Sequence, residues 1–110
     1  MSENVLRRVR LALQTGDYPT AIQGLESAAQ TAREAGDRAG EGRHLGNLGL
    51  IYHRLGLMEQ ALQAFHRALL SARADGDRLT EDGLLGNMGN ILRELGRYED
   101  ALSYLDNEFD

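Results

Sequence analysis

The chain has 110 residues, of which 42% are hydrophobic and 26% are charged, with a single proline. This composition is typical of one folded domain and excludes an intrinsically disordered chain. The formal charge of -5 argues against general binding to nucleic acid or to membrane surfaces, because such binding needs clustered positive charge.

Cysteine is absent, so disulfides, thiolate metal sites and cysteine nucleophiles are excluded. The sequence holds no run of about 18 apolar residues that would predict a membrane span. Its first residues also lack the apolar core and the cleavage site of a signal peptide. We therefore expect a cytoplasmic protein.

Apolar residues recur along the chain with the period of a helix. In one segment they fall at Leu45, Leu48 and Tyr52, and in the next at Ala61 and Phe65. No segment alternates with the period of two that a strand requires, and β-branched residues are scarce. The fold class is therefore all-α. In chain order, we predict helices near residues 3–15, 18–35, 38–55, 58–75, 78–95 and 98–107.

The boundaries between the predicted helices carry residues that end one helix and begin the next. Glycine suits the C-terminal end of a helix, and it occurs in the sequences AGD at 35–37 and DGD at 75–77. The aspartates of these sequences, Asp37 and Asp77, can cap the N-terminus of the helix that follows.

The sequence repeats itself after 40 residues, which predicts a repeat architecture. A shift of 40 places aligns Gly36, Asp37 and Arg38 with Gly76, Asp77 and Arg78, Gly46 and Asn47 with Gly86 and Asn87, and Leu55 and Gly56 with Leu95 and Gly96. Because each unit holds two helices, we predict a single domain over 1–110 made of three antiparallel hairpins. These span 1–36, which is divergent, 37–76 and 77–110.

Two glycines, Gly49 and Gly89, fall inside predicted helices at equivalent positions of the repeat. A glycine there costs roughly 0.5 to 1 kcal/mol relative to alanine. We interpret both as packing positions where two helix backbones approach closely, with Ala61 or Ala68 opposite. A large side chain at Gly49 is therefore expected to lower the thermal midpoint sharply.

The second and third units share a pattern of small and large residues. Its members are Leu45, Leu48, Gly49, Tyr52, Ala61, Phe65 and Ala68 in one unit and Leu85, Met88, Gly89, Leu92 and Ala101 in the next. This pattern resembles the tetratricopeptide repeat family, in its 40-residue variant found in kinesin light chains, Pins-type G-protein-signalling modulators and Rap-like peptide receptors. The resemblance implies a right-handed superhelical solenoid that binds a peptide segment of a partner protein in a concave groove.

The resemblance also implies that the first helix of each hairpin lines the concave side. Helical spacing sends a stripe of residues on helix 38–55 away from the core. Asparagines at Asn47 and Asn87 could hold the backbone of an extended peptide, because an amide both donates and accepts hydrogen bonds. Alternatively, these asparagines cap or bridge neighbouring helices. The predicted peptide-binding residues are Arg43, Asn47, Leu50, His53, Arg54, Asn87, Asn90 and Arg93.

No motif in the sequence supports catalysis. His44, His53 and His66 do not have the spacing of metal ligands, and we predict that His44 and His66 are surface or boundary residues. No convergent set of nucleophile, base and orienting group is evident. We therefore expect a non-enzymatic protein without a cofactor or metal and without nucleic-acid or membrane partners.

The last predicted helix carries apolar residues that no later helix covers, namely Leu102, Tyr104 and Leu105. Solenoids usually end on a polar cap. Either the chain is a fragment of a longer array, or this surface packs against another copy. The second case gives the alternative function, a structural unit that homo-oligomerises through its uncapped C-terminal helix.

Overall fold

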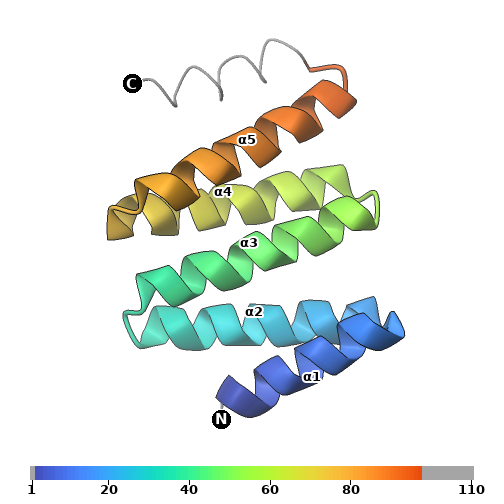
Figure 1. Cartoon of the computed structure of the whole chain (residues 1–110), viewed down its shortest axis with the longest axis vertical. Coiled ribbons are helices and arrows are strands. Elements are labelled where there is room, and N and C mark those ends of the chain that lie inside the picture. The colour runs from blue at the N-terminus through green and yellow to red at the C-terminus, as the bar shows by residue number, and fades with distance from the viewer. Residues whose placement is uncertain (1, 98–110) are drawn as a thin grey trace.

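The computed structural model describes residues 2–97, and within them the chain forms five α-helices and no strand (Figure 1). Their bounds are Ser2–Thr15 for α1, Tyr18–Glu34 for α2, Arg38–Arg54 for α3, Met58–Asp75 for α4 and Arg78–Glu94 for α5. Each bound lies within one residue of the predicted helix, so these five predictions are confirmed. The sixth predicted helix, 98–107, lies outside the described residues.

The helices stack in chain order, each antiparallel to the one before it (Figure 1). Each packs mainly on its neighbours in sequence, so that α3 lies between α2 and α4. The pairs α1–α2 and α3–α4 form two hairpins, and α5 packs on α4. The second helix of the predicted third hairpin lies outside the described residues. This arrangement confirms the all-α helical solenoid. None of the helices described is long and apolar enough to cross a membrane.

The helix boundaries form as their sequences predict. The Asp37 carboxylate accepts a hydrogen bond from the backbone N–H of Gly40 at 2.9 Å, and Asp77 accepts one from the N–H of Thr80 at 3.1 Å. The Thr80 hydroxyl also donates to Asp77, and these two hydrogen bonds lower the pKa of Asp77. A left-handed backbone, which glycine adopts without strain, recurs every 20 residues at Gly16, Gly36, Gly56, Gly76 and Gly96.

The core lies where the helices of each hairpin meet, and Phe65 of α4 is at its centre. Phe65 is 0% exposed. A Cβ atom added at Gly49 of α3 would lie 2.7 Å from two carbons of the Phe65 ring. Gly49 is therefore a close-packing position, as predicted, and the atoms nearest to it are those of the Phe65 ring. This contact holds α3 against α4 and positions the outer side of α3.

Candidate functional site

The outer side of α3 carries the four residues that helical spacing places there. These are Arg43, Asn47, Leu50 and Arg54, and all four are exposed. We call them the α3 stripe. Leu50 is 50% exposed, which is a large apolar area for a residue in the middle of a helix. The stripe is thus a mixed surface of two guanidinium groups, one amide and one aliphatic side chain.

Two hollows flank the α3 stripe. The α3–α5 hollow has a volume of about 320 Å³ and lies between α3 and α5, above the side chain of Phe65. The α1–α3 hollow has a volume of about 290 Å³ and is lined by α1, α2 and α3. Asn47 and Leu50 line both hollows, so the two spaces meet at the middle of the stripe.

The α3–α5 hollow is the polar one. Asn47 and Arg43 line it from α3, and Asn87 lines it from α5. Within the described part of the chain, the amides of Asn47 and Asn87 form no hydrogen bond. Their donors and acceptors are therefore not used by neighbouring helices there, and the two residues face one space from two repeats.

The α1–α3 hollow is the apolar one. Val9 of α1, Leu25 of α2 and Ile51 of α3 are buried at its base, and Leu13 and Leu50 are partly exposed at its edge. Tyr18, Asn47 and Arg54 complete the lining. The residues that α1 and α2 contribute to this hollow were not predicted. The signal that could have found them is an exposed leucine on a helix whose outer face is otherwise polar.

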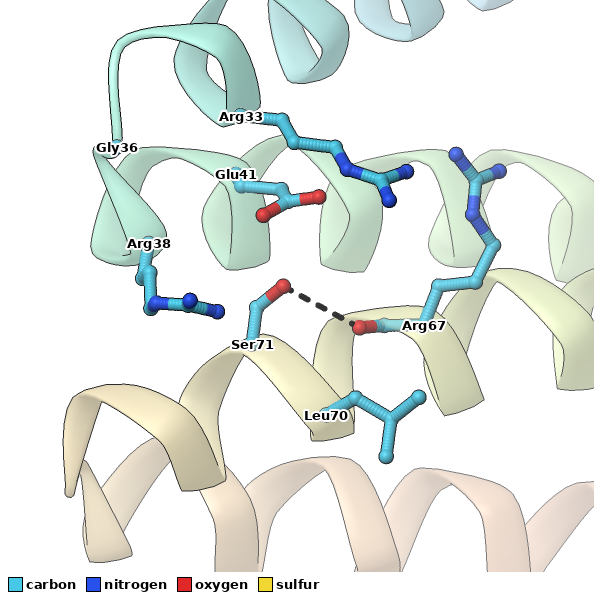
Figure 2. A pocket seen from close by; sticks show the side chains of 7 residues that line it. All are labelled: Arg33, Gly36, Arg38, Glu41, Arg67, Leu70 and Ser71. Atoms are coloured by element: carbon cyan, nitrogen blue, oxygen red, sulfur yellow. Dashed lines mark hydrogen bonds between the residues drawn. The ribbon is translucent and has the colours of Figure 1, made fainter.

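A third hollow, of about 400 Å³, lies between α2 and α4 beside the start of α3 (Figure 2). It is lined by Arg33, Gly36, Arg38, Glu41, Arg67, Leu70 and Ser71. We call it the arginine hollow. None of the residues predicted for peptide binding lines it, and it shares only Arg38 with the α3–α5 hollow.

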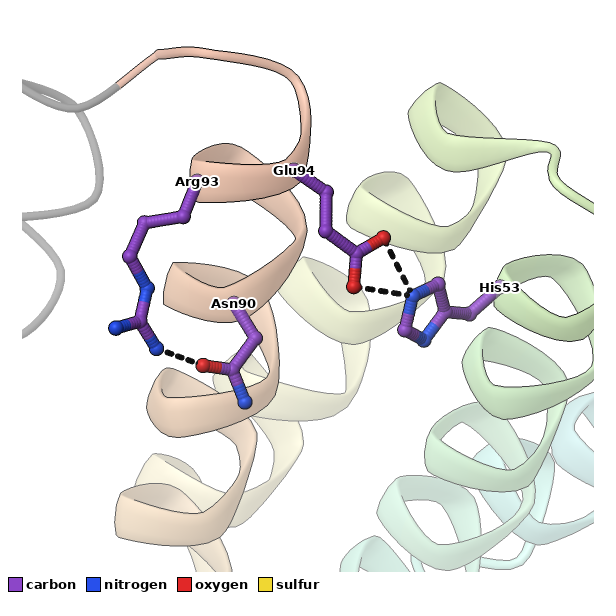
Figure 3. Close-up of polar contacts among 4 residues, drawn as sticks. All are labelled: His53, Asn90, Arg93 and Glu94. Atoms are coloured by element: carbon purple, nitrogen blue, oxygen red, sulfur yellow. Dashed lines mark hydrogen bonds and ion pairs between the residues drawn. The ribbon is translucent and has the colours of Figure 1, made fainter.

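The remaining predicted residues of α5 and the end of α3 are engaged in contacts (Figure 3). The Arg93 guanidinium donates a hydrogen bond to the side-chain oxygen of Asn90 on the same helix. His53 Nε2 lies 3.1 and 3.2 Å from the two carboxylate oxygens of Glu94. This contact links α3 to α5. His53 therefore has a structural partner, whereas Asn47 and Asn87 do not.

His44 is buried, so its prediction as a surface or boundary residue was wrong, while His66 is exposed as predicted. The reason is helical spacing, since His44 lies on the same face of α3 as the buried residues Gly40, Leu48 and Ile51. Burial lowers the pKa of His44, and the positive charge of Arg43 lowers it further, against a smaller opposing effect of Asp37.

We expect the free energy of unfolding to fall as the pH is lowered from 7.5 to 5. An unfolded histidine has a pKa of about 6.5, so below that pH the unfolded chain binds a proton that folded His44 excludes. The contribution of His44 to the free energy of unfolding is therefore fully present above a pH of about 6.5. It is lost as the pH falls from there through the lower pKa of His44 in the folded state. Urea unfolding at several pH values would measure the slope.

The matched comparison uses two single variants. His44→Gln is expected to flatten the pH dependence between 7.5 and 5, whereas His66→Gln, at an exposed histidine, should leave it unchanged. An equal slope in His44→Gln and the unmodified chain would contradict this account of His44.

Within residues 2–97, no group of three or more histidine or acidic residues could hold a metal ion.

A tetratricopeptide repeat family model matches residues 2–74, and a second tetratricopeptide repeat model matches residues 84–108. No curated protein matches the chain. Repeats of this family generally mediate protein–protein interactions and are typically non-catalytic. Since the first match covers more than half of the sequence and includes the divergent first hairpin, the chain belongs to the tetratricopeptide repeat family.

Proposed function

We propose that the chain binds an extended peptide segment of a partner protein across the α3 stripe. The observation that supports this most directly is that Asn47 and Leu50 line both the polar α3–α5 hollow and the apolar α1–α3 hollow. A single peptide strand crossing the middle of α3 would therefore reach both hollows.

In the α3–α5 hollow, the amides of Asn47 and Asn87 are the groups that would bind the peptide backbone. Each amide can donate to a peptide C=O and accept from a peptide N–H at the same time. Both amides lack hydrogen bonds within the described residues, so binding would not have to break a protein contact first. Arg43 lies beside Asn47 and could pair with an acidic side chain of the peptide.

In the α1–α3 hollow, the peptide would place an apolar side chain. Successive side chains of an extended segment point to opposite sides, so one residue can fill the hollow while its neighbours face solvent. Burying one aliphatic or aromatic side chain contributes about 1.5 to 3 kcal/mol. Arg54 at the edge favours an acidic residue next to that apolar side chain.

The test is selection of peptides from a random library with the unmodified chain, followed by fluorescence anisotropy of the selected peptides. Replacing Asn47 and Asn87 together by alanine is expected to weaken binding roughly 10- to 100-fold, because each lost hydrogen bond is worth about 0.5 to 1.5 kcal/mol. Gln63→Ala removes an exposed amide from α4 and should leave the affinity unchanged.

Circular dichroism of the double alanine variant must show the same helicity as the unmodified chain, so that a loss of binding reports on the groove. Undiminished binding by that variant would count against the proposal. So would a failure of the library to yield any peptide that competes at the stripe.

The alternative function, homo-oligomerisation through Leu102, Tyr104 and Leu105, rests on residues that lie outside the described part of the chain. Light scattering coupled to size exclusion over a dilution series separates the two functions. An oligomer that dissociates when Leu102 and Leu105 are both replaced by glutamate would favour self-assembly, and a monomer would favour the groove.

A further inference from the structure

The arginine hollow lies on the side of α3 that faces away from the α3 stripe. Glu41, which lines the hollow, and Leu50, which belongs to the stripe, are nine residues apart. At 3.6 residues per turn this separation is two and a half turns, so the two side chains point in opposite directions. Arg38, at the start of α3, lines both the arginine hollow and the α3–α5 hollow. No residue of the α3 stripe lines the arginine hollow, so a ligand there would leave the stripe accessible.

Three helices each contribute one guanidinium group to the arginine hollow. Arg33 comes from the last turn of α2, Arg38 from the start of α3, and Arg67 from the middle of α4. Figure 2 shows the Arg33 side chain extending toward that of Arg67, while Arg38 extends toward Ser71. The hollow thus gathers positive charge from segments that are far apart in the sequence.

These arginines are only partly compensated by acidic groups. The chain has 17 acidic residues and 12 basic ones, yet within the described residues Arg33 and Arg38 form no ion pair. Arg67 Nη1 lies 3.1 Å from a carboxylate oxygen of Glu26, which leaves its other nitrogens available. Several other arginines of the described chain also lack an ion pair, but Arg33 and Arg38 line one hollow together with Arg67. An anion in this hollow could therefore contact guanidinium groups of three helices.

Two further residues that line the arginine hollow indicate which groups of a ligand it would contact. Leu70 is 53% exposed at the edge of the hollow, so it offers apolar surface next to the positive charge. The hydroxyl of buried Ser71 donates to the backbone oxygen of Arg67 at 3.4 Å, and rotation of this hydroxyl would let it donate to an anion instead. The Glu41 carboxylate also lines the hollow and would repel an anion.

We propose that the arginine hollow binds a phosphorylated side chain of a partner protein. A phosphate group offers three acceptor oxygens and a charge between -1.5 and -2 at pH 7, whereas a carboxylate can be satisfied by one bidentate arginine. Guanidinium groups that come from three helices therefore suit the phosphate better. The attraction to three arginines exceeds the repulsion from the single carboxylate of Glu41, and Leu70 would contact an apolar residue beside the phosphorylated one.

The experiment is a titration of the ¹⁵N-labelled chain, followed by NMR, with three blocked dipeptides at constant ionic strength: phosphoserine-leucine, serine-leucine and glutamate-leucine. We expect phosphoserine-leucine to shift the backbone signals of Gly36 and Arg38 in a saturable way. The other two dipeptides are expected to bind at least fivefold more weakly. The same titration with inorganic phosphate shows how much of the binding comes from the phosphate group alone.

Variants test the assignment in both directions. Replacing Arg33 and Arg38 by glutamine should abolish the saturable shifts, while Glu41→Gln should tighten binding severalfold by removing a negative charge. Arg10→Gln removes an exposed arginine of α1 outside the hollow and should bind like the unmodified chain. The Asn47 and Asn87 double alanine variant should also retain binding, which separates this site from the groove.

Equal affinity for the glutamate and phosphoserine dipeptides would overturn the proposal of a phosphate ligand. Unchanged binding in the Arg33 and Arg38 double variant, or weaker binding in Glu41→Gln with unchanged helicity, would overturn the proposed location of the site.

Discussion

Replacing Gly49 by leucine is expected to destabilise the fold by about 1 to 3 kcal/mol, the usual effect of overpacking a core. Even the first carbon of the new side chain would lie 2.7 Å from the Phe65 ring. The ring cannot move aside at low cost because Phe65 is fully buried. Urea unfolding followed by circular dichroism would measure the loss, and the thermal midpoint should fall by roughly 10 °C for a loss of 2 kcal/mol.

A matched control distinguishes this clash from a general effect of removing glycine from a helix. Gly83 lies inside α5, and a Cβ added there would meet no atom within 4 Å. Gly83→Ala is therefore expected to stabilise the chain by up to about 1 kcal/mol through helix propensity. If Gly49→Leu left the midpoint unchanged, the close contact with Phe65 would not exist in solution.

The clash can also be relieved by a smaller side chain at Phe65. Phe65→Leu replaces the ring that a Cβ at Gly49 would meet by a smaller side chain. Gly49→Ala should therefore destabilise the Phe65→Leu variant less than it destabilises the unmodified chain. Residues in contact usually show such non-additive effects of 0.5 to 3 kcal/mol. Strict additivity of the two substitutions would contradict direct contact.

Phe65→Ala is expected to destabilise the chain by about 3 to 5 kcal/mol, the range for truncating a buried aromatic residue. Phe65 is the largest fully buried side chain among the described residues, and it also forms the base of the α3–α5 hollow. Single domains are typically stable by only about 5 to 15 kcal/mol, so this one truncation should remove a large share of the stability. Urea unfolding would quantify it.

The control for Phe65→Ala is truncation of an apolar residue that packs against little. Leu79 in the first turn of α5 is 85% exposed, and Leu79→Ala is expected to change the stability by no more than about 0.5 kcal/mol. A loss below 1 kcal/mol in Phe65→Ala would show that the core can collapse around the cavity. The packing of α3 on α4 would then not depend on this ring.

The five described helices were predictable because their signals are local. Asp37 and Asp77 cap helices through hydrogen bonds that span three residues, and a positive φ every 20 residues needs only a glycine at the right place. The exposed α3 stripe was predictable for the same reason, since it follows from the helical period alone. His44 was predicted wrongly although its spacing from Leu48 placed it on the buried face.

The hollows could not be predicted, because they depend on which helices become neighbours. Asn47 and Asn87 are 40 residues apart, and they share a space only because α3 and α5 both pack on α4. Glu94 meets His53 for a related reason, across two successive repeats. Side-chain partners at that separation have no signal in a single sequence.

The sequence by itself therefore determined the helices, their boundaries, the 40-residue repeat and the family, since periodicity, caps and glycine stops act over a few residues. Only the tertiary structure decided that the α3 stripe joins a polar hollow to an apolar one. It also decided that Arg33, Arg38 and Arg67 surround one hollow on the opposite side. The physical reason is that α2 and α4 pack on the same helix, α3, and this packing brings together side chains that the sequence keeps apart.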